Sequence, residues 1–414
     1  MSPVRGRRVF VTGLGFVSPH GERPSEVFER LCRGESAIRL VRSGTAELGA
    51  DVLLARVDFE PGNRIAKLDQ VQMARAAQMA VVATRGALEH AGLLVDVDGP
   101  EEAAVYMGCG LGGAEILQHS YSRYFLRGNR RFRPTTVPLI MANGPASQVS
   151  MRFRLRGPAQ TYSIACASSS VAIGEAFRSI RDGYADVCVA GGAEAMLNDA
   201  SVAAWQGLGV IAQHCSDTPS TSCRPFDLER TGLVLGEGAA TLILESAQRT
   251  AERGAKPLAE IVGFGASSDA HHLTDPATDG QERAIRMALL DAGVPAHRIG
   301  YVNAHATGTK AGDPVEIEAI KRVFGAAARE VAVSSTKSMH GHLVGASGAL
   351  ECAITVLALH ERRVPPTANL TAPDPECDLD CVPVVGRDAP DLEFAMSNSF
   401  AFGGSNATLV LRRA

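Results

Sequence analysis

The feature that most constrains the fold of this chain is the alternation of short β-branched runs with longer segments of helical periodicity. Strand-like runs occupy residues 9–12, 103–107, 187–190, 301–304, 331–334 and 394–397. Between them, apolar residues recur at helical spacing in segments such as 70–90 and 281–292, which end at Gly92 and Gly293. Glycines follow several runs, and we expect them to end those strands in turns. The pattern predicts an α/β protein with largely buried strands.

Length and composition exclude several classes of protein. With 414 residues, 45% hydrophobic and 21% charged, the chain is expected to form roughly one to three domains with a large core. Lysine and arginine total 41 against 45 acidic residues, and the net charge of −4 excludes a generally basic nucleic-acid binder. The nine cysteines contain no CxxC pair, which favours a reducing compartment over a disulfide scaffold.

No segment has the character of a membrane span or a signal peptide. The most apolar helical segment, 349–359, is short and carries Glu351. The basic N-terminus runs directly into a strand without an apolar stretch before it. We therefore expect a cytoplasmic protein with no membrane span.

The order of segments hints at an internal duplication. In the first half a strand leads to Cys166, small residues and a helix, and in the second half the strand 394–397 leads to a glycine turn. A polar helical stretch at 249–256 supplies a natural boundary, which divides the chain into residues 1–254 and 255–414. An undivided, unrepeated chain is the alternative.

Cys166 is the first candidate for chemistry. A β-prone run stops at this cysteine, and an apolar helix begins after the small residues that follow it. A cysteine at a helix N-terminus is near free N–H groups and the helix dipole, which favour the nucleophilic thiolate. The alternative is a buried structural cysteine, which is the commoner fate of this residue.

Two further segments carry histidines after predicted strands. His305 follows the strand 301–304, and His342 follows the strand 331–334 together with Lys337. Each histidine is either a catalytic imidazole or a hydrogen-bonded core residue. Lys337 is either a solvated charge or a buried lysine, and burial would require a carboxylate partner such as Glu351. His340 and His342 have no evident third ligand nearby, so no metal site is predicted.

A glycine turn near the C-terminus is the last candidate. It follows a strand end that carries Phe400, Ala401 and Phe402. Such a turn can present backbone N–H groups or act as a gate, and an ordinary glycine turn is the alternative.

Taken together, these segments resemble the β-ketoacyl-acyl-carrier-protein synthases, and most of all the type II elongating synthase of bacterial fatty acid synthesis. The resemblance covers nearly the whole chain. It rests on residues 11–15, 108–113, 157–158, 190–194, 224–227, 236–239, 263–269, 305–313, 337–341 and 398–406, and on the turn at Cys166.

The resemblance implies an α/β thiolase fold, with two similar halves, each containing a mixed five-stranded sheet, stacked in five αβαβα layers. It also implies a homodimer. The implied activity is that of a 3-oxoacyl-[acyl-carrier-protein] synthase in fatty acid biosynthesis, an acyltransferase that extends an acyl chain by two carbons. No cofactor is expected on the enzyme, because the substrates are carried on the phosphopantetheine of acyl carrier protein.

The resemblance also implies catalytic roles. Cys166 would hold the acyl group as a thioester, and His305 and His342 would promote decarboxylation of the malonyl group and stabilise the enolate. The backbone N–H groups of Cys166 and Phe402 would form the oxyanion hole, and the Phe402 side chain would act as a gate. Lys337, held by Glu351, would orient the site.

Substrate contacts and the docking surface follow from the same resemblance. The residues implied to contact substrate are Thr307, Thr309, Leu111, Phe400 and Ala401. Acyl carrier proteins are acidic, so a basic surface should bind them. Arg127, Arg130 and Arg131 are the best candidates, and Arg64 and Lys67 are the second choice; solvated surface charge is the alternative for each.

Three positions depart from the family pattern. Ala306 and Ala401 stand where the family usually has glycine, and His340 stands where it usually has threonine. Ala401 is expected to stiffen the gate, because a Cβ restricts the backbone, and His340 is expected to support its neighbours. These departures leave a second function open, namely a specialised ketosynthase of a polyketide, polyene or modified-lipid pathway that acts with a ketosynthase-like partner subunit in a heterodimer.

Overall fold

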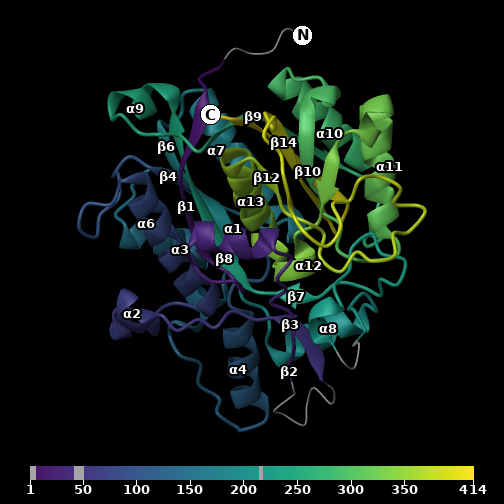
Figure 1. The fold of residues 1–414 in the computed structure, drawn as a ribbon. Helices are drawn as coiled ribbons and strands as arrows, with labels where there is room; N and C mark the ends of the chain where they lie inside the picture. The colour runs from purple at the N-terminus through teal and green to yellow at the C-terminus, as the bar shows by residue number, and fades with distance from the viewer. Residues whose placement is uncertain (1–5, 42–50, 214–217) are drawn as a thin grey trace.

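A mixed sheet of ten strands runs through the computed structural model, which describes residues 6–41, 51–213 and 218–414 (Figure 1). In spatial order the strands are β11 (Ala332–Ser334), β10 (Ile299–Asn303), β14 (Phe394–Ala401), β15 (Ser405–Arg413), β9 (Ala259–Ser268), β1 (Val9–Val17), β8 (Gly238–Ser246), β6 (Val187–Glu194), β4 (Ala104–Gly108) and β5 (Ala159–Tyr162). Strands β1 and β9 pair antiparallel through residues 9–11 and 259–261. The two predicted five-stranded sheets are therefore joined edge to edge.

The pairing senses repeat in the two halves of this sheet. From the β11 edge inward, two parallel pairings are followed by two antiparallel pairings, ending at β9. From the β5 edge inward, the same sequence ends at β1. This repeat agrees with the duplication inferred from the sequence, although the exact division at residues 254 and 255 stays a prediction.

Helices form three layers around the sheet halves. In the middle, α7 (Ser168–Arg181) contacts α13 (Ser347–Glu361), and the two helices reach strands of both halves. On one outer side α3 (Arg75–Ala91) and α6 (Gly144–Arg152) cover β1, β8 and β4. On the other side α10 (Thr278–Ala292) lies over β9 and β15, and α11 (Gly312–Phe324) packs beside α10 (Figure 1). The predicted five-layered α/β architecture is confirmed.

Smaller elements complete the described part of the chain. The remaining helices are α1 (Pro24–Cys32), α2 (Lys67–Gln70), α4 (Ala114–Phe125), α5 (Thr136–Ile140), α8 (Asp199–Gly207), α9 (Ala247–Glu252) and α12 (Lys337–His340). The short strands are β2 (Arg39–Val41), β3 (Val52–Ala55), β7 (Leu235–Gly236), β12 (Arg363–Val364) and β13 (Arg387–Asp388). None of the helices described is both long enough and apolar enough to cross a membrane.

The burial of α13 explains its sequence. All residues from Ser347 to Leu359 are buried, because sheet strands of both halves pack around the helix. A helix enclosed in this way is apolar on every face rather than on one stripe. The single acidic side chain in its middle, Glu351, is therefore held away from water.

Glycines extend strands where we expected them to end strands. β1 was expected to stop at residue 12, but it continues to Val17 through Gly13 and Gly15. A Cβ at these glycines would lie 2.3 Å from the carbonyl oxygen of Ala87 and 2.0 Å from that of Ala83, both in α3. The glycines thus allow α3 to approach the strand closely. β6 likewise continues through residues 191–192 to Glu194.

Candidate active site

Cys166 lies in a tight elbow between β5 and α7, as predicted. The elbow is a 3-10 turn, η2 (Ala165–Ala167), followed directly by α7 at Ser168. Its first residue, Ala165, has a positive φ of 42°, a conformation that is costly for a residue with a side chain. The Ser168 hydroxyl donates to the Ala165 carbonyl at 2.7 Å and accepts the Ile164 N–H at 2.8 Å. These bonds hold the strained turn that places Cys166.

The second half of the chain contains an equivalent elbow. Here the 3-10 turn is η6 (Val344–Ala346), its first residue has a φ of 44°, and α13 begins at Ser347. Gly345 occupies the position that Cys166 has in the first elbow. A Cβ on Gly345 would lie 2.5 Å from the Gly110 nitrogen and 2.7 Å from Glu194 Oε2, so this position has no room for a side chain.

Three predicted residues from both halves meet at the first elbow. The Nε2 atom of His342 lies 2.9 Å from Cys166 Sγ, and its Nδ1 lies 2.7 Å from the Ser347 hydroxyl. The ring of His305 stands nearly perpendicular to that of His342, with centroids 5.4 Å apart. One ligand-capable atom from each of Cys166, His305 and His342 falls within 4.8 Å of the other two. Residues widely separated in sequence thus form one compact cluster.

Burial keeps this cluster neutral. It raises the pKa of the Cys166 thiol to about 12, although Lys337 and the backbone N–H groups of Phe402 and Cys166 act in the opposite direction. Burial and the nearby Lys337 also lower the pKa values of His305 and His342 well below the ordinary range. The expected thiolate is therefore not the resting form of Cys166, because loss of solvation outweighs Lys337 and the nearby backbone N–H groups that favour the charged form. The cluster rests as a thiol beside neutral imidazoles.

The cluster also has the residue types of a zinc site. On tetrahedral zinc, sulfur and nitrogen ligands at 2.3 and 2.0 Å would be separated by about 3.5 Å. Cys166 Sγ and His342 Nε2 are 2.9 Å apart, which is the distance of a direct thiol–imidazole contact. The geometry therefore favours proton exchange between these two groups over shared coordination of a metal.

Lys337 and Glu351 form the predicted buried ion pair. Lys337 Nζ lies 2.5 Å from Glu351 Oε1, and the two side chains are 1% and 0% exposed. The two groups are in direct contact, and neither Glu351 oxygen has a hydrogen-bond donor other than Lys337 among the described residues. Burial raises the pKa of Glu351 to about 7, and Lys337 opposes this shift. The solvated-surface alternative for Lys337 is thus wrong.

A buried carboxylate that the sequence analysis missed fixes the His305 loop. Glu316, on α11, accepts the backbone N–H of His305 at 2.9 Å and that of Ala306 at 2.7 Å. The Asn398 side chain donates to the same carboxylate at 3.0 Å. The only signal in the sequence was an acidic residue on an otherwise half-apolar helix, and that does not indicate which loop it binds. Ser347, which contacts His342, was missed for the same reason.

Glu194 is a second buried carboxylate whose role was not foreseen. It accepts N–H groups from Gly110 at 2.7 Å, Leu111 at 3.3 Å and Gly345 at 3.2 Å. It therefore ties the loop after β4 to the second elbow. Leu111 itself points outward with 52% of its side chain exposed, and it does not line the cavity described next.

A cavity of about 810 Å³, its open mouth included, leads to Cys166. Besides Cys166, His305 and His342, the predicted residues along its wall are Thr307, Thr309, Phe400, Ala401 and Phe402. The Thr307 hydroxyl donates to the Thr309 hydroxyl at 3.3 Å. Four of the five predicted substrate contacts and the predicted gate therefore face one space, and two of them offer hydroxyl groups on an otherwise largely apolar wall.

Phe402 stands at the mouth of this cavity and contacts the only tryptophan of the chain. The Trp205 ring, from α8, stacks on Phe402 with centroids 5.9 Å apart. The turn after Phe402 is held by the Gly403 N–H, which donates to the Leu273 carbonyl at 2.7 Å, and by the Gly404 carbonyl, which accepts the Asp269 N–H at 2.7 Å. The turn that follows Phe402 is therefore anchored at both of its glycines, and the Phe402 ring is packed against Trp205.

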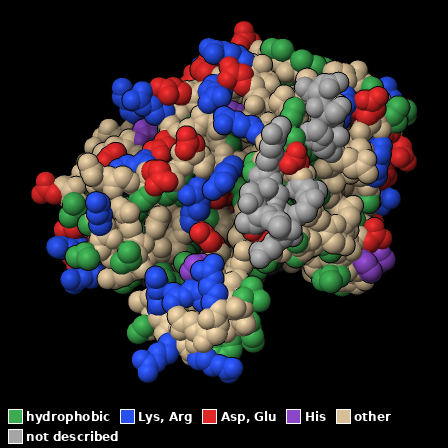
Figure 2. All heavy atoms as spheres, turned by 90° about the horizontal axis from the view of Figure 1, so that it is seen from below, with side chains coloured by type: hydrophobic (Ala, Val, Ile, Leu, Met, Phe, Trp, Pro, Cys, Tyr) green, Lys and Arg blue, Asp and Glu red, His purple; other side chains and the backbone are tan. Residues whose placement is uncertain are grey.

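The predicted docking residues differ in how they are placed. Arg127, Arg130 and Arg131 are exposed in the segment after α4, and none has a carboxylate partner within the described ranges. Lys67 is also exposed at the start of α2. Arg64 is engaged instead, because it pairs with Glu22 and donates to backbone carbonyls. Figure 2 shows groups of Lys and Arg side chains on the lower face of the molecule.

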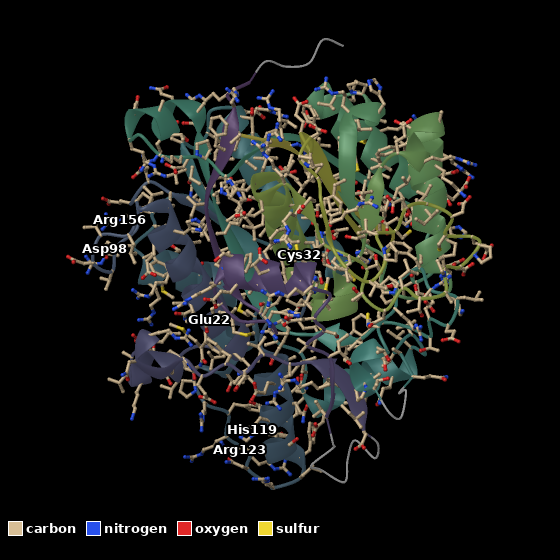
Figure 3. All side chains as sticks on the ribbon, in the orientation of Figure 1. Glu22, Cys32, Asp98, His119, Arg123 and Arg156 are labelled. Carbon is tan, nitrogen blue, oxygen red and sulfur yellow. The ribbon has the colours of Figure 1, made fainter. Side chains whose placement is uncertain are left out.

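Exposed aromatic rings accompany the basic segment. Tyr121, Tyr124 and Phe125 of α4 form a cluster with Phe132, with ring centroids 4.9 to 6.5 Å apart. The Arg130 guanidinium lies 5.7 Å from the Tyr124 ring centre. On α4, His119 and Arg123 extend this surface at the lower end of the molecule (Figure 3). The surface therefore combines unpaired positive charge with apolar rings.

Comparison with known proteins identifies relatives along almost the whole chain. Residues 6–250 match the family model "Beta-ketoacyl synthase, N-terminal domain", and residues 258–371 match "Beta-ketoacyl synthase, C-terminal domain". The chain is 42% identical to nodulation protein E of Rhizobium sp. (strain N33), over 98% of this chain and 99% of that protein. It is 38% identical to 3-oxoacyl-[acyl-carrier-protein] synthase 2 of Staphylococcus aureus (strain COL), over 99% of both chains.

Solved structures agree with the sequence comparison. The structure described as the ishigamide ketosynthase/chain length factor superposes with a TM-score of 0.90. It is 36% identical in sequence, and the match covers 99% of this chain and 100% of that one.

Proposed function

The chain belongs to the β-ketoacyl synthase family, and from that premise we propose how its own residues carry out the reaction. The chain is a condensing acyltransferase, a 3-oxoacyl-[acyl-carrier-protein] synthase that joins a malonyl-derived unit to an acyl group. The observation that carries the residue assignment is the Cys166–His342 contact of 2.9 Å beside His305, at the inner end of an open cavity.

Loading of the acyl group begins at the neutral thiol–imidazole pair. As Cys166 Sγ attacks the thioester carbon of the incoming acyl group, its proton passes to His342 Nε2. The tetrahedral intermediate collapses with release of the carrier thiolate, which takes the proton back from His342. One thioester is exchanged for another, and no net proton is gained or lost.

Decarboxylation of the malonyl group needs donors for the developing enolate oxygen. The Nε2–H groups of His305 and His342 are placed for this task, and burial strengthens their interaction with negative charge. The Ser347 hydroxyl can either accept from His342 Nδ1 or donate to it, so the imidazole can present either tautomer at Nε2. The bond between the carboxylate carbon and the neighbouring carbon breaks, and carbon dioxide leaves. The electron pair of that bond forms the enolate.

Condensation completes the cycle at Cys166. The enolate carbon attacks the acyl-cysteine carbonyl, and the backbone N–H groups of Cys166 and Phe402 stabilise the resulting oxyanion. Both N–H groups already face the sulfur closely enough to lower its pKa. Collapse of this intermediate breaks the carbon–sulfur bond and releases the 3-oxoacyl product. The Cys166 thiolate that leaves takes one proton from water entering through the open cavity and so returns to the thiol form. Lys337 and Glu351 orient the site and do not exchange protons with substrate.

The substrate arrives on an acyl carrier protein, for which we propose the surface around Arg127, Arg130 and Arg131. Unpaired arginines attract an acidic partner, and the neighbouring aromatic rings offer apolar contact area. Lys67 is a secondary contact. Arg64 contributes less, because its charge is already neutralised by Glu22. The phosphopantetheine arm would then enter the cavity past the hydroxyl groups of Thr307 and Thr309.

We further propose that the chain works as a cytoplasmic homodimer joined at the β5 edge. β5 is the outer strand of the sheet, and an uncovered edge of this kind is normally paired or protected. Leu111, exposed after the adjacent strand β4, would then be covered by the second subunit. The alternative is a heterodimer with a ketosynthase-like subunit, like the pairing of ketosynthase and chain length factor in the ishigamide protein.

A specialised pathway is the second candidate function. Ala306 and Ala401 add Cβ atoms at the cavity, and His340 replaces the family's usual threonine close to His342. The similarity to nodulation protein E also points away from general fatty acid synthesis. These observations concern which acyl chain is extended and leave the condensation chemistry unchanged.

A condensation assay tests the proposal. The purified chain is mixed with malonyl-carrier protein and a panel of saturated, unsaturated and aryl acyl-carrier proteins, and products are identified by mass spectrometry. Extension of saturated chains by this chain alone supports the fatty acid function, and extension of only other primers supports the specialised one. Cys166→Ala should abolish condensation, with Cys188→Ala, a buried cysteine in β6, as the matched control. Condensation by Cys166→Ala near the wild-type rate would refute the residue assignment.

A further inference from the structure

His340 is a fully buried histidine whose two ring nitrogens both have partners. It is the last residue of α12 and is 0% exposed. Its Nδ1 lies 2.7 Å from the carbonyl oxygen of Gly341, and its Nε2 lies 2.9 Å from the hydroxyl oxygen of Thr336. The side chain therefore bridges the residue before α12 and the residue after it.

The partners determine the position of the ring proton. A carbonyl oxygen can only accept, so Nδ1 must carry a hydrogen and donate to Gly341. Burial and the nearby Lys337 lower the pKa of His340 well below its ordinary value, so the ring is neutral and Nε2 has no hydrogen. The Thr336 hydroxyl therefore donates to Nε2. We assign a single tautomer to His340, with both nitrogens satisfied.

The two contacts of His340 reach the residues next to Lys337 and His342. Thr336 immediately precedes Lys337, and Gly341 immediately precedes His342. The N–H of His342 donates to the Val234 carbonyl at 2.7 Å. With the Gly341 carbonyl bound to His340, the peptide unit that leads into His342 is held at both its C=O and its N–H group.

This segment needs such a constraint because its own structure is weak. α12 contains four residues, and one helical turn has little stability by itself. Gly341 adopts a φ of 69°, and a Cβ there would lie 2.8 Å from the Ala55 side chain, so the position requires glycine. Glycine leaves the backbone free to rotate when it is not held. A side-chain clamp from outside the backbone supplies the missing rigidity.

We propose that His340 is a positioning residue that fixes His342 relative to Lys337 and so keeps His342 Nε2 in contact with Cys166 Sγ. His340 touches no reacting atom, and it acts through the Gly341 carbonyl and the Thr336 hydroxyl. The Thr336 hydroxyl oxygen also lies 3.4 Å from Oδ1 of Asn303, two residues before His305, although its one hydrogen is used in the shorter contact to His340. The clamp therefore lies where all three loops of the site meet.

Two amide substitutions separate the two contacts of His340. His340→Asn places an amide donor near the position of Nδ1 and can keep the bond to Gly341. His340→Gln places its amide near the position of Nε2 and can keep only the Thr336 contact. His340→Leu removes both. Thr84→Val, which removes the buried hydroxyl contact to Thr241 on the outer face of β8, is the control for general destabilisation.

The first readout does not depend on condensation and so stands apart from the proposed function on which the inference rests. The rate of Cys166 alkylation by iodoacetamide is followed by peptide mass spectrometry, at a temperature where circular dichroism shows each variant folded. The alkylation rate should be about tenfold lower in His340→Leu and His340→Gln, because displacing a reactive group by a small distance slows its reaction by at least that factor. It should stay within about threefold of wild type in His340→Asn, which can keep the bond to Gly341. Thr84→Val should keep the wild-type rate.

The second readout is condensation, where kcat should fall in the same order while KM changes little. The proposal is overturned if His340→Leu alkylates at the wild-type rate, if His340→Gln recovers as well as His340→Asn, or if Thr84→Val loses as much as His340→Leu. If His340→Leu does not fold, the comparison of Asn with Gln decides. Absence of condensation in the wild-type chain would refute the proposed function, while the alkylation rates would still test the clamp.

Discussion

Breaking the Lys337–Glu351 pair should destabilise the protein, and removing both charges should reverse the loss. In Glu351→Gln the Lys337 ammonium stays buried without its counter-charge, since the two side chains are 1% and 0% exposed. The double variant Lys337→Met/Glu351→Leu replaces both charged groups with apolar ones of similar size. The sign of the effect should therefore differ between the single and the double variant.

The magnitude follows from burial and from the lack of supporting hydrogen bonds. Leaving one charge of a buried pair uncompensated costs about 3–5 kcal/mol, whereas replacing the whole pair with apolar side chains is often neutral or stabilising by about 1–4 kcal/mol. Here the described residues offer the Glu351 carboxylate no donor besides Lys337 to offset its desolvation, which favours a gain in the double variant. With an unfolding entropy of about 2.1 cal/mol/K per residue, a loss of about 4 kcal/mol lowers Tm by about 5 °C for a chain of this length.

Scanning calorimetry and urea titration measure these changes, and the two should agree in sign. Glu351→Gln should show a lower midpoint, and the double variant a midpoint at or above that of the wild type. A double variant as unstable as Glu351→Gln would refute the reasoning, because packing around these side chains and not the unpaired charge would then cause the loss. Condensation should fall strongly in both variants, because Lys337 orients the site through its charge.

Three further predictions concern the cavity. Because burial raises the pKa of Cys166 to about 12, its thiolate fraction grows about tenfold per pH unit below that value, so the iodoacetamide rate should keep rising from pH 6 to pH 9; a plateau near pH 7 would contradict the neutral resting thiol. Acylation of Cys166 should move Phe402 away from Trp205, and tryptophan emission, which comes from Trp205 alone, should change in wild type but not in Cys166→Ala. Ala401→Gly should widen the range of acyl chains extended, since it frees the backbone beside the gate; an unchanged substrate profile in competition assays would show that Ala401 does not control selectivity.

Most residues of the Cys166 cluster could be predicted from the sequence, because they follow predicted strands. Cys166 and His305 stand where a predicted strand gives way to small residues, and chains of this class bring such strand ends together. The duplication could be predicted for a related reason, since each half repeats an order of strands and helices. The ends of strands were less predictable. Gly13 and Gly15 are required by the close approach of α3, which is distant in sequence, and they do not end β1.

Contacts made only in three dimensions escaped the sequence analysis. Glu316 and Ser347 act on loops that folding brings to them, and nothing local marks their partners. The sequence could not show that Arg64 is less available for docking than Arg127, because the charge of Arg64 is neutralised by Glu22 only in the folded chain. Leu111 was expected to contact substrate, but it lies on the surface and does not line the cavity that leads to Cys166. The balance between burial and the helix dipole at Cys166 also needs the full packed environment.

The two elbows bear on how a duplicated protein can acquire new chemistry. A repeat begins with two equivalent positions, and either could in principle hold a nucleophile. In this chain the second position, Gly345, cannot hold a side chain. The backbone of Gly110 and the Glu194 carboxylate occupy the space that such a side chain would need. A change at that position would have to displace a whole loop and a buried acid together, which single substitutions rarely achieve.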